Sequence, residues 1–301
     1  MVYIDPDELK WMPYVKTWSN RLPESIGLLD EHKKYMLALF DTHIDDCLYY
    51  LRKNCTVGIH QVEISKVITM CKLLESIFLE PNAIEKGADR SKVRTLICQC
   101  FVFCMIWALG GNINEQHRDS YETFVRSRFE ENEDAKLSTA ADLWSLYVDA
   151  KNKRQDSWAK IIPEFVYEAE VPFFEILVPT QDTVRFGYLM KKLLDVNQGV
   201  LFTGNTGVGK SVIAKSVLNA IAKEDTWVPV TLNFSAQTSS SRTQEMIEIK
   251  LEKKKKTLLG APVGKRVIVF VDDVNMPRLD TYGSQPPIEL LRYEIISYLP
   301  P

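Results

Sequence analysis

The sequence predicts an α/β fold with a doubly wound parallel sheet, which follows an all-helical segment. Three observations carry this prediction. Residues 199–273 alternate between short apolar runs and helical patterns, which is typical of βαβ units. Residues 30–129 show apolar positions at helical spacing only. A glycine-rich motif at residues 204–211 lies between an expected strand and an expected helix.

The composition is that of an ordinary globular protein. Of 301 residues, 46% are apolar and 26% are charged, and 37 basic residues stand against 40 acidic ones. General binders of nucleic acid or of anionic membranes are more basic, so we expect no nucleic-acid partner and no membrane partner. The longest apolar stretch, from Leu96 to Leu109, is shorter than the roughly 18 to 20 residues that cross a bilayer, and it predicts a buried helix.

The N-terminal sequence and the cysteines indicate a protein of the cytoplasm. The sequence MVYIDPDELKW has acidic residues where an export signal carries positive charge. No CxxC pair occurs, and apolar neighbours favour packed, reduced thiols over disulfides or a metal site. The four histidines lack metal-ligand spacing. The cysteines are Cys47, Cys55, Cys71, Cys98, Cys100 and Cys104.

Four helices are expected in the first half, because apolar residues recur there at spacings of three and four. Their expected ranges are 30–53, 67–78, 91–109 and 121–129. Gly110 and Gly111 follow the third helix, where a residue free to take positive φ commonly forms the cap. Such stripes are more often core than a cofactor pocket, so we assign this half no catalytic site. The polar stretch 149–158 has no sustained period and is the expected linker.

The second half contains a complete P-loop motif. The apolar run 199–203 (GVLFT) leads into GNTGVGKS at residues 204–211, and the helical pattern VIAKSVLNAIAK follows. This is GxxxxGK[ST] between a strand and a helix, the context that the motif requires. The alternative is a glycine turn that only begins a helix, and the presence of both Lys and Ser at the required positions disfavours it.

Each residue type in the motif has a physical task in binding phosphates. Glycines let the backbone wrap a phosphate chain, and the amides of residues 207–210 point inward at a helix N-terminus, where the dipole favours anions. Lys210 is expected to reach the β- and γ-phosphates, and the Ser211 hydroxyl to ligate Mg²⁺. The candidate nucleotide-binding residues are Gly204, Asn205, Thr206, Gly207, Val208, Gly209, Lys210 and Ser211.

A P-loop needs an acidic residue at the end of another buried strand to hold the metal. The apolar run Val267 to Val271 is followed by Asp272 and Asp273. We expect Asp272 to contact Mg²⁺ directly or through water, and Asp273 to be the catalytic general base that orients the attacking water. The alternative is a strand that ends in two solvated carboxylates, which the upstream P-loop disfavours.

A further strand and helix are expected between the two motifs. Residues 228–234 (VPVTLNF) are the expected strand, and a helix opens at Ser241 with Gln244 at capping-box spacing. The order strand, helix, strand, helix, strand predicts a ligand at the carboxyl ends of the strands. The lysine run 253–256 is expected on a solvated helix end.

These motifs resemble the third AAA+ module of a dynein heavy chain, and the stretch DDVNMP at residues 272–277 is most similar to the axonemal members. Residues 161–301 resemble the P-loop large subdomain of that module, and residues 1–160 the helical subdomain, or lid, that closes the second module. The resemblance ends at about residue 292. It rests on GNTGVGKSVI, VTLNFSAQTSSSRTQEMIEIKLEKK and GKRVIVFVDDVNMPRLDTYGSQPPIELLR, and upstream on PEFVYEAEVPFFEILVPTQDTVRFGYLMKKLL.

The resemblance implies an AAA+ P-loop NTPase fold in a ring-shaped, ATP-driven microtubule motor. The implied cofactors are ATP or ADP and Mg²⁺. The implied partners are other AAA+ modules of the ring, microtubules and dynein light or intermediate chains, and the implied location is the cytoskeleton of the ciliary axoneme. The family's leading segment passes the adenine at the positions of Val178, Pro179 and Thr180.

Two departures from the family pattern bear on activity. AAA+ ATPases usually carry Glu where this chain has Asp273, and since a misplacement of about 1 Å costs ~10²-fold in rate, we expect slow hydrolysis or none. The sequence after Arg292, YEIISYLPP, does not match, so we expect an incomplete sheet in a truncated product that is no motor by itself. Two alternatives stay open, a self-sufficient NTPase or kinase and a non-catalytic interaction module with a vestigial P-loop.

Overall fold

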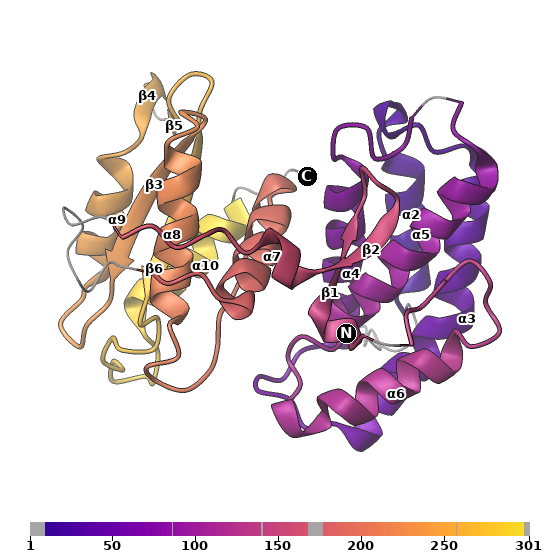
Figure 1. Cartoon of the computed structure of the whole chain (residues 1–301). Coiled ribbons are helices and arrows are strands. Elements are labelled where there is room, and N and C mark those ends of the chain that lie inside the picture. The colour runs from indigo at the N-terminus through magenta and orange to yellow at the C-terminus, as the bar shows by residue number, and fades with distance from the viewer. Residues whose placement is uncertain (1–9, 86, 140, 168–176, 257, 298–301) are drawn as a thin grey trace, which may run out of the picture. The chain divides into compact units, whose positions relative to one another are not determined.

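The computed structural model of the chain describes residues 10–85, 87–139, 141–167, 177–256 and 258–297 (Figure 1). It divides into two compact units, residues 1–210 and residues 211–301. The first unit is mostly helical, and the second alternates strands with helices. This is the predicted class, an incomplete α/β fold that follows a helical segment.

The first unit confirms the four helices expected from apolar periodicity. The predicted stripe of α3 is buried, with Met36, Phe40 and Ile44 fully enclosed, and the Phe40 ring meets Phe101 of α5 edge to face at 5.0 Å between centroids. Apolar area removed from water in this way is the main favourable contribution to folding. The helices are α2 (Met12–Arg21), α3 (Asp30–Asn54), α4 (Glu63–Phe78), α5 (Arg90–Cys104), α6 (Arg118–Arg128) and α7 (Gln181–Asp195).

Helix α5 is the central buried helix, as predicted. It continues into a π-helical turn, Met105–Leu109. By length and composition alone, the segment Arg90–Leu109 would suffice to cross a membrane, but 83% of its apolar window is buried inside the protein, as in the core helix of a globular unit. All six cysteines are free and five are buried, and burial raises the pKa of Cys47 to about 12. These are the packed thiols that the sequence predicts.

The two glycines after α5 are required by crowding, and the predicted positive-φ cap is wrong. Gly110 has a φ of −92°. A Cβ at Gly110 would lie 2.4 Å from Cε1 of Tyr121, and one at Gly111 would lie 2.3 Å from the carbonyl oxygen of Trp107. Glycine is therefore needed here because α6 and the π-turn approach the backbone closely.

The expected linker at residues 149–158 is also wrong, because this stretch is part of a hairpin. Strands β1 (Leu146–Asp149) and β2 (Arg154–Ser157) pair in antiparallel fashion. Trp158, which follows β2, is fully buried and stacks on Tyr147 with centroids 5.0 Å apart. The hairpin is polar in sequence because only alternate residues face the core.

Helix α7 packs within the first unit, although it lies beyond residue 160. The Tyr188 hydroxyl donates at 3.3 Å to Glu80, two residues after the end of α4, and Lys192 pairs with the same carboxylate at 2.5 Å. The Phe186 ring meets Trp107 edge to face at 6.2 Å between centroids. The division into subdomains at residue 160 stays a prediction.

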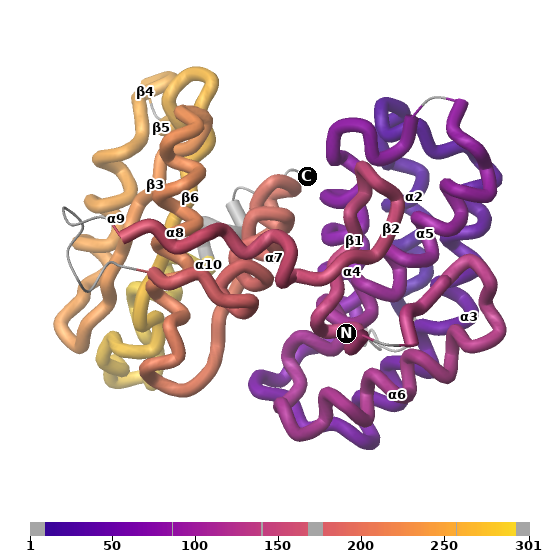
Figure 2. The backbone as a smooth tube through the Cα atoms, viewed as in Figure 1, coloured from indigo at the N-terminus to yellow at the C-terminus, as the bar shows by residue number. Residues whose placement is uncertain are grey.

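The second unit is built on a short parallel sheet. Strands β3 (Trp227–Asn233) and β6 (Arg266–Asp272) are neighbours in this sheet (Figure 2). They pair so that Asn233 stands opposite Asp272. Val230, Leu232 and Phe234 form the centre of its core. The remaining elements are α8 (Lys210–Ala222), α9 (Ser240–Glu248), the hairpin strands β4 (Glu252–Lys255) and β5 (Leu258–Gly260), and α10 (Pro286–Ser297).

Three local expectations for residues 199–256 are wrong. Residues 199–203 form no strand in the part of the chain that the structure describes, since a strand needs a hydrogen-bonded neighbour and none is provided there. The first three lysines of the run, Lys253–Lys255, lie in the exposed strand β4, not on a helix, because α9 already ends at Glu248. Helix α9 is capped by Ser239, whose Oγ accepts from the Arg242 amide at 3.2 Å, two residues before the predicted start.

Candidate functional site

The loop at residues 204–210 holds its three glycines in conformations that side chains resist. The φ angle is 149° at Gly204, 85° at Gly207 and 83° at Gly209. A Cβ at Gly207 or Gly209 would meet no described atom within 4 Å, so backbone conformation and not crowding requires glycine at both positions. This agrees with the reason for which the sequence analysis selected these residues.

The Lys210 side chain turns back over its own loop. Its Nζ donates to the carbonyl oxygens of Gly204 at 3.0 Å and Asn205 at 2.6 Å. Lys210 is also the first residue of α8, so the ammonium group adds its charge to the positive end of a helix dipole. A phosphate oxygen is a stronger acceptor than a neutral carbonyl, and the ammonium group is therefore available to an anion in the loop.

In the second unit, the Asp272 carboxylate is held between two side chains of α8. The Ser211 hydroxyl donates to Oδ1 at 2.6 Å, and the Lys215 ammonium pairs with Oδ2 at 3.2 Å. Ser211 and Lys215 are four residues apart and thus share one face of the helix. Asp272 ends β6, where the Phe234 amide donates to its carbonyl oxygen at 3.1 Å. The strand therefore fixes the backbone from which the carboxylate projects.

Electrostatics keep this carboxylate ionised. Burial alone would raise the pKa of Asp272, whose side chain is 18% exposed. Hydrogen bonds from Ser211 and from Lys215, together with the lysine charge, outweigh burial, and the pKa lies below its ordinary value. A negative charge is therefore present at this point at neutral pH.

The oxygen atoms of Ser211 and Asp272 suit Mg²⁺. Carboxylate and hydroxyl oxygens are the hard ligands that this ion prefers, and it usually keeps several waters and takes few protein ligands. The two oxygen atoms already lie side by side. In the described residues, no group of three or more His, Cys, Asp or Glu side chains is placed to hold a metal, so a carboxylate-rich site is not the arrangement seen here.

Asp273 is separate from this pair. It is exposed and has a φ of 54°, and its carbonyl oxygen accepts from the Met276 amide at 3.0 Å in the turn that follows β6. Aspartate and asparagine tolerate this left-handed conformation better than most residues do. The turn therefore fits Asp at this position.

The predicted adenine segment lies at the start of α7. The Thr180 hydroxyl caps this helix by accepting from the Thr183 amide at 3.3 Å. Val178 is 53% exposed, and Pro179 is partly exposed. Their described contacts thus give Thr180 a structural role and leave the Val178 side chain accessible.

Sequence reasoning did not select Lys215. The signal was present, because VIAK after Ser211 puts a lysine one helical turn beyond the hydroxyl. What the pattern could not supply is the position of Asp272, which decides whether that lysine faces solvent or a carboxylate.

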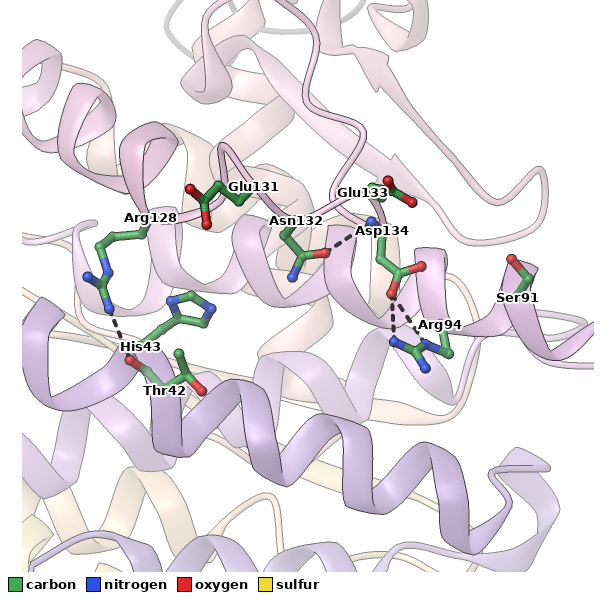
Figure 3. Close-up of a pocket in the computed structure, with 9 residues that line it drawn as sticks. All are labelled: Thr42, His43, Ser91, Arg94, Arg128, Glu131, Asn132, Glu133 and Asp134. Atoms are coloured by element: carbon green, nitrogen blue, oxygen red, sulfur yellow. Dashed lines mark hydrogen bonds and ion pairs between the residues drawn. The ribbon is translucent and has the colours of Figure 1, made fainter.

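A hollow of about 660 Å³ lies elsewhere, in the first unit, between α3, α5 and the segment after α6 (Figure 3). Its arginines already have acidic partners: Arg94 binds Asp134 at 3.1 Å, and Arg128 binds Asp46 at 2.8 Å. Glu131 and Glu133 also line the hollow (Figure 3). Both arginine charges at this surface are therefore paired within the protein.

Two family models match most of the chain. Residues 165–297 match a family described as the P-loop containing dynein motor region, and residues 36–160 match the dynein heavy chain AAA lid domain. The first match extends to residue 297, beyond Arg292, where the sequence analysis expected the resemblance to end.

Individual relatives show the same pattern. The chain is 57% identical over 292 residues to dynein axonemal heavy chain 6 of Homo sapiens, 33% identical over 310 residues to dynein axonemal heavy chain 12 of Rattus norvegicus, and 32% identical over 293 residues to dynein axonemal heavy chain 2 of Homo sapiens. Each alignment covers 97% of this chain, but only 7%, 10% and 6% of the respective relative. The chain therefore spans about a tenth or less of the length of these curated relatives.

Proposed function

Because this chain belongs to the dynein heavy chain family, as an AAA+ segment of an axonemal member, we propose that its P-loop binds ATP or ADP together with Mg²⁺. The observation that carries the proposal is the 2.6 Å hydrogen bond between Ser211 and Asp272. It joins the last residue of the P-loop motif to the acidic residue at the end of β6, as a metal-assisted nucleotide site requires.

In this proposal the glycine loop and Lys210 hold the phosphates. Positive φ at Gly207 and Gly209 gives the backbone the curvature that an anion cradle needs, and the helix N-terminus adds a favourable dipole. Asn205, Thr206 and Val208 belong to the same cradle and contribute backbone groups. Lys210 exchanges its two carbonyl partners for phosphate oxygens.

Ser211 and Asp272 are the residues proposed to hold Mg²⁺, which when bound neutralises phosphate charge. The ionised state of Asp272 supports this role, because a metal ligand must be deprotonated. Val178, Pro179 and Thr180 are proposed to lie beside the adenine, with Val178 as the exposed apolar contact.

We propose slow hydrolysis or none. The general-base position is held by Asp273, whose carboxylate is one methylene nearer to the backbone than that of Glu and whose backbone is set by a left-handed turn. Both features change the distance between the base and an attacking water, and the rate of hydrolysis depends strongly on that distance. The nucleotide then has a structural or regulatory role.

At the level of the whole heavy chain, we propose that this segment is one part of an AAA+ ring that works on microtubules in the ciliary axoneme. The support is that the relatives are named as axonemal dynein heavy chains. Neighbouring AAA+ modules would be the direct partners of this segment, and light or intermediate chains would be partners of the heavy chain.

Titration with a fluorescent ATP analogue tests nucleotide binding. Lys210→Ala removes the phosphate-facing charge, and we expect its affinity for the analogue to be at least about tenfold lower than that of wild type. Lys223→Ala removes the same charge one residue beyond the end of α8, at the opposite end of that helix from Lys210, and serves as the matched control. Equal affinity in wild type and Lys210→Ala would leave the interaction-module alternative.

A further inference from the structure

We propose that Lys215 is an internal competitor for Mg²⁺: its ammonium group neutralises Asp272 when the metal is absent and raises the Mg²⁺ concentration at which the metal takes its place. The inference rests on the proposed nucleotide site and adds to it a control of metal occupancy. It concerns a residue that the P-loop motif does not include.

The first step is that both oxygens of the Asp272 carboxylate are engaged. Oδ1 accepts from Ser211 at 2.6 Å, and Oδ2 pairs with the Lys215 Nζ at 3.2 Å. A cation that approaches this carboxylate therefore meets a positive charge at hydrogen-bond distance from one of its two oxygens. Mutual repulsion of the two cations opposes simultaneous occupancy.

The second step is that Lys215 can leave. Its side chain is 46% exposed, whereas that of Asp272 is 18% exposed. A lysine at a half-exposed position keeps a flexible stem and a strongly hydrated ammonium group, so release into solvent costs little. Asp272 in contrast is fixed by β6. The lysine is thus the movable member of the pair.

The third step concerns nucleotide bound without metal. An ionised carboxylate near the end of a phosphate cradle repels the phosphates, and Lys215 offsets that charge. Removal of the Lys215 charge therefore has two opposite effects. The affinity for nucleotide in the absence of Mg²⁺ falls, and the increase in affinity on addition of Mg²⁺ becomes larger. Because binding free energies are linked, both effects appear in a single cycle of metal and nucleotide.

The test measures the affinity of a fluorescent ADP analogue for the full 301-residue chain at a series of free Mg²⁺ concentrations, beginning in EDTA. For Lys215→Gln we expect the midpoint of the Mg²⁺ dependence to fall by about twofold to fivefold, within the range for exposed ion pairs. Affinity in EDTA falls in the same variant. Lys215→Arg keeps the charge and retains the wild-type midpoint, and Lys223→Gln removes a lysine beyond the pair and changes neither quantity.

The outcomes are distinguishable. An unchanged Mg²⁺ midpoint in Lys215→Gln, with nucleotide still bound, overturns the inference and leaves the proposed function intact. Absence of analogue binding by wild type at every Mg²⁺ concentration overturns the proposed function itself. If Lys215→Gln unfolds, Lys215→Met keeps the apolar stem and gives the same comparison. A purely structural role for Lys215 would lower affinity equally with and without Mg²⁺, which also contradicts the inference.

Discussion

The Ser211 hydroxyl donates a 2.6 Å hydrogen bond to Oδ1 of Asp272, a residue 61 positions later in the chain. One of the two atoms belongs to the helix that follows the glycine loop, and the other to the end of a parallel strand. The contact joins the last residue of the P-loop motif to the aspartate at the end of β6. It also fixes which substitutions discriminate between a nucleotide site and a structural turn.

Ser211→Ala removes this hydroxyl. We expect the Mg²⁺-dependent gain in nucleotide affinity to fall by about tenfold, since a charge-assisted hydrogen bond and a metal ligand are lost together. Ser216→Ala makes the same change at an exposed position of the same helix and keeps the full gain. The measurement is analogue titration with and without Mg²⁺, and equal gains in the two variants would contradict the assignment of Ser211.

Gly209→Ala tests the backbone of the loop. With φ at 83° and no described atom within 4 Å of a Cβ, the substitution costs only the strain of a left-handed conformation, on the order of 1 kcal/mol. We expect a loss of nucleotide affinity of about fivefold, measured by analogue titration. Gly199→Ala, at a glycine without positive φ and with equal space around it, leaves affinity unchanged.

Asp273 substitutions test the reason for slow turnover. If a shortened base limits the rate, Asp273→Glu raises steady-state phosphate release above wild type, and Asp273→Asn does not. Asparagine accepts the same left-handed conformation, so Asp273→Asn removes the charge without changing the turn. Identical rates in all three proteins would show that the carboxylate at this position takes no part in hydrolysis.

His43 makes the stability of the first unit depend on pH. The ring is buried against Phe129, with centroids 4.2 Å apart, and burial followed by the Arg128 charge lowers its pKa from 6.5 to about 4. Between these two values the unfolded chain binds a proton that the folded chain excludes, so the free energy of unfolding falls as the pH falls through this window. Urea unfolding at pH 7, 5.5 and 4.5 should therefore show a smaller loss in His43→Phe than in wild type. Equal losses of unfolding free energy in the two proteins would contradict the assignment of this pH dependence to His43.

Gly110→Ala should destabilise the helical unit. The added Cβ would stand 2.4 Å from Cε1 of Tyr121 and 2.7 Å from the Ile106 carbonyl oxygen. Because Tyr121 is fully buried and donates to the Met105 carbonyl at 2.8 Å, it cannot move aside cheaply. We expect a loss of about 2 to 3 kcal/mol in chemical unfolding. Gly199→Ala serves again as the control, and a loss no greater than that control would show that the turn can relax.

Much of the local structure was predictable because it depends on neighbours in the chain. The stripe in residues 30–53 predicts α3 to within one residue, since helical hydrogen bonds and apolar spacing are both local. The strands around Val230 and Val269 were predicted to within one residue at each end, the second of them from a continuous apolar run. The β1–β2 hairpin was missed because each strand has only four residues, too few for the alternation of buried and exposed positions to stand out among polar residues. Strand β4 was missed because a run of charged residues has no apolar periodicity.

The sequence by itself determined the glycine loop, the adjacent lysine and hydroxyl, and the aspartate at the end of a strand, because motif spacing and side-chain chemistry are written along the chain. Only the tertiary structure decided that Lys215 pairs with Asp272 and that residues 199–203 lack strand pairing in the described part. It also decided that the Tyr121 ring leaves no room for a side chain at Gly110. The reason is physical: an ion pair, a sheet hydrogen bond and a steric contact each depend on an atom distant in sequence, whose position is set by packing.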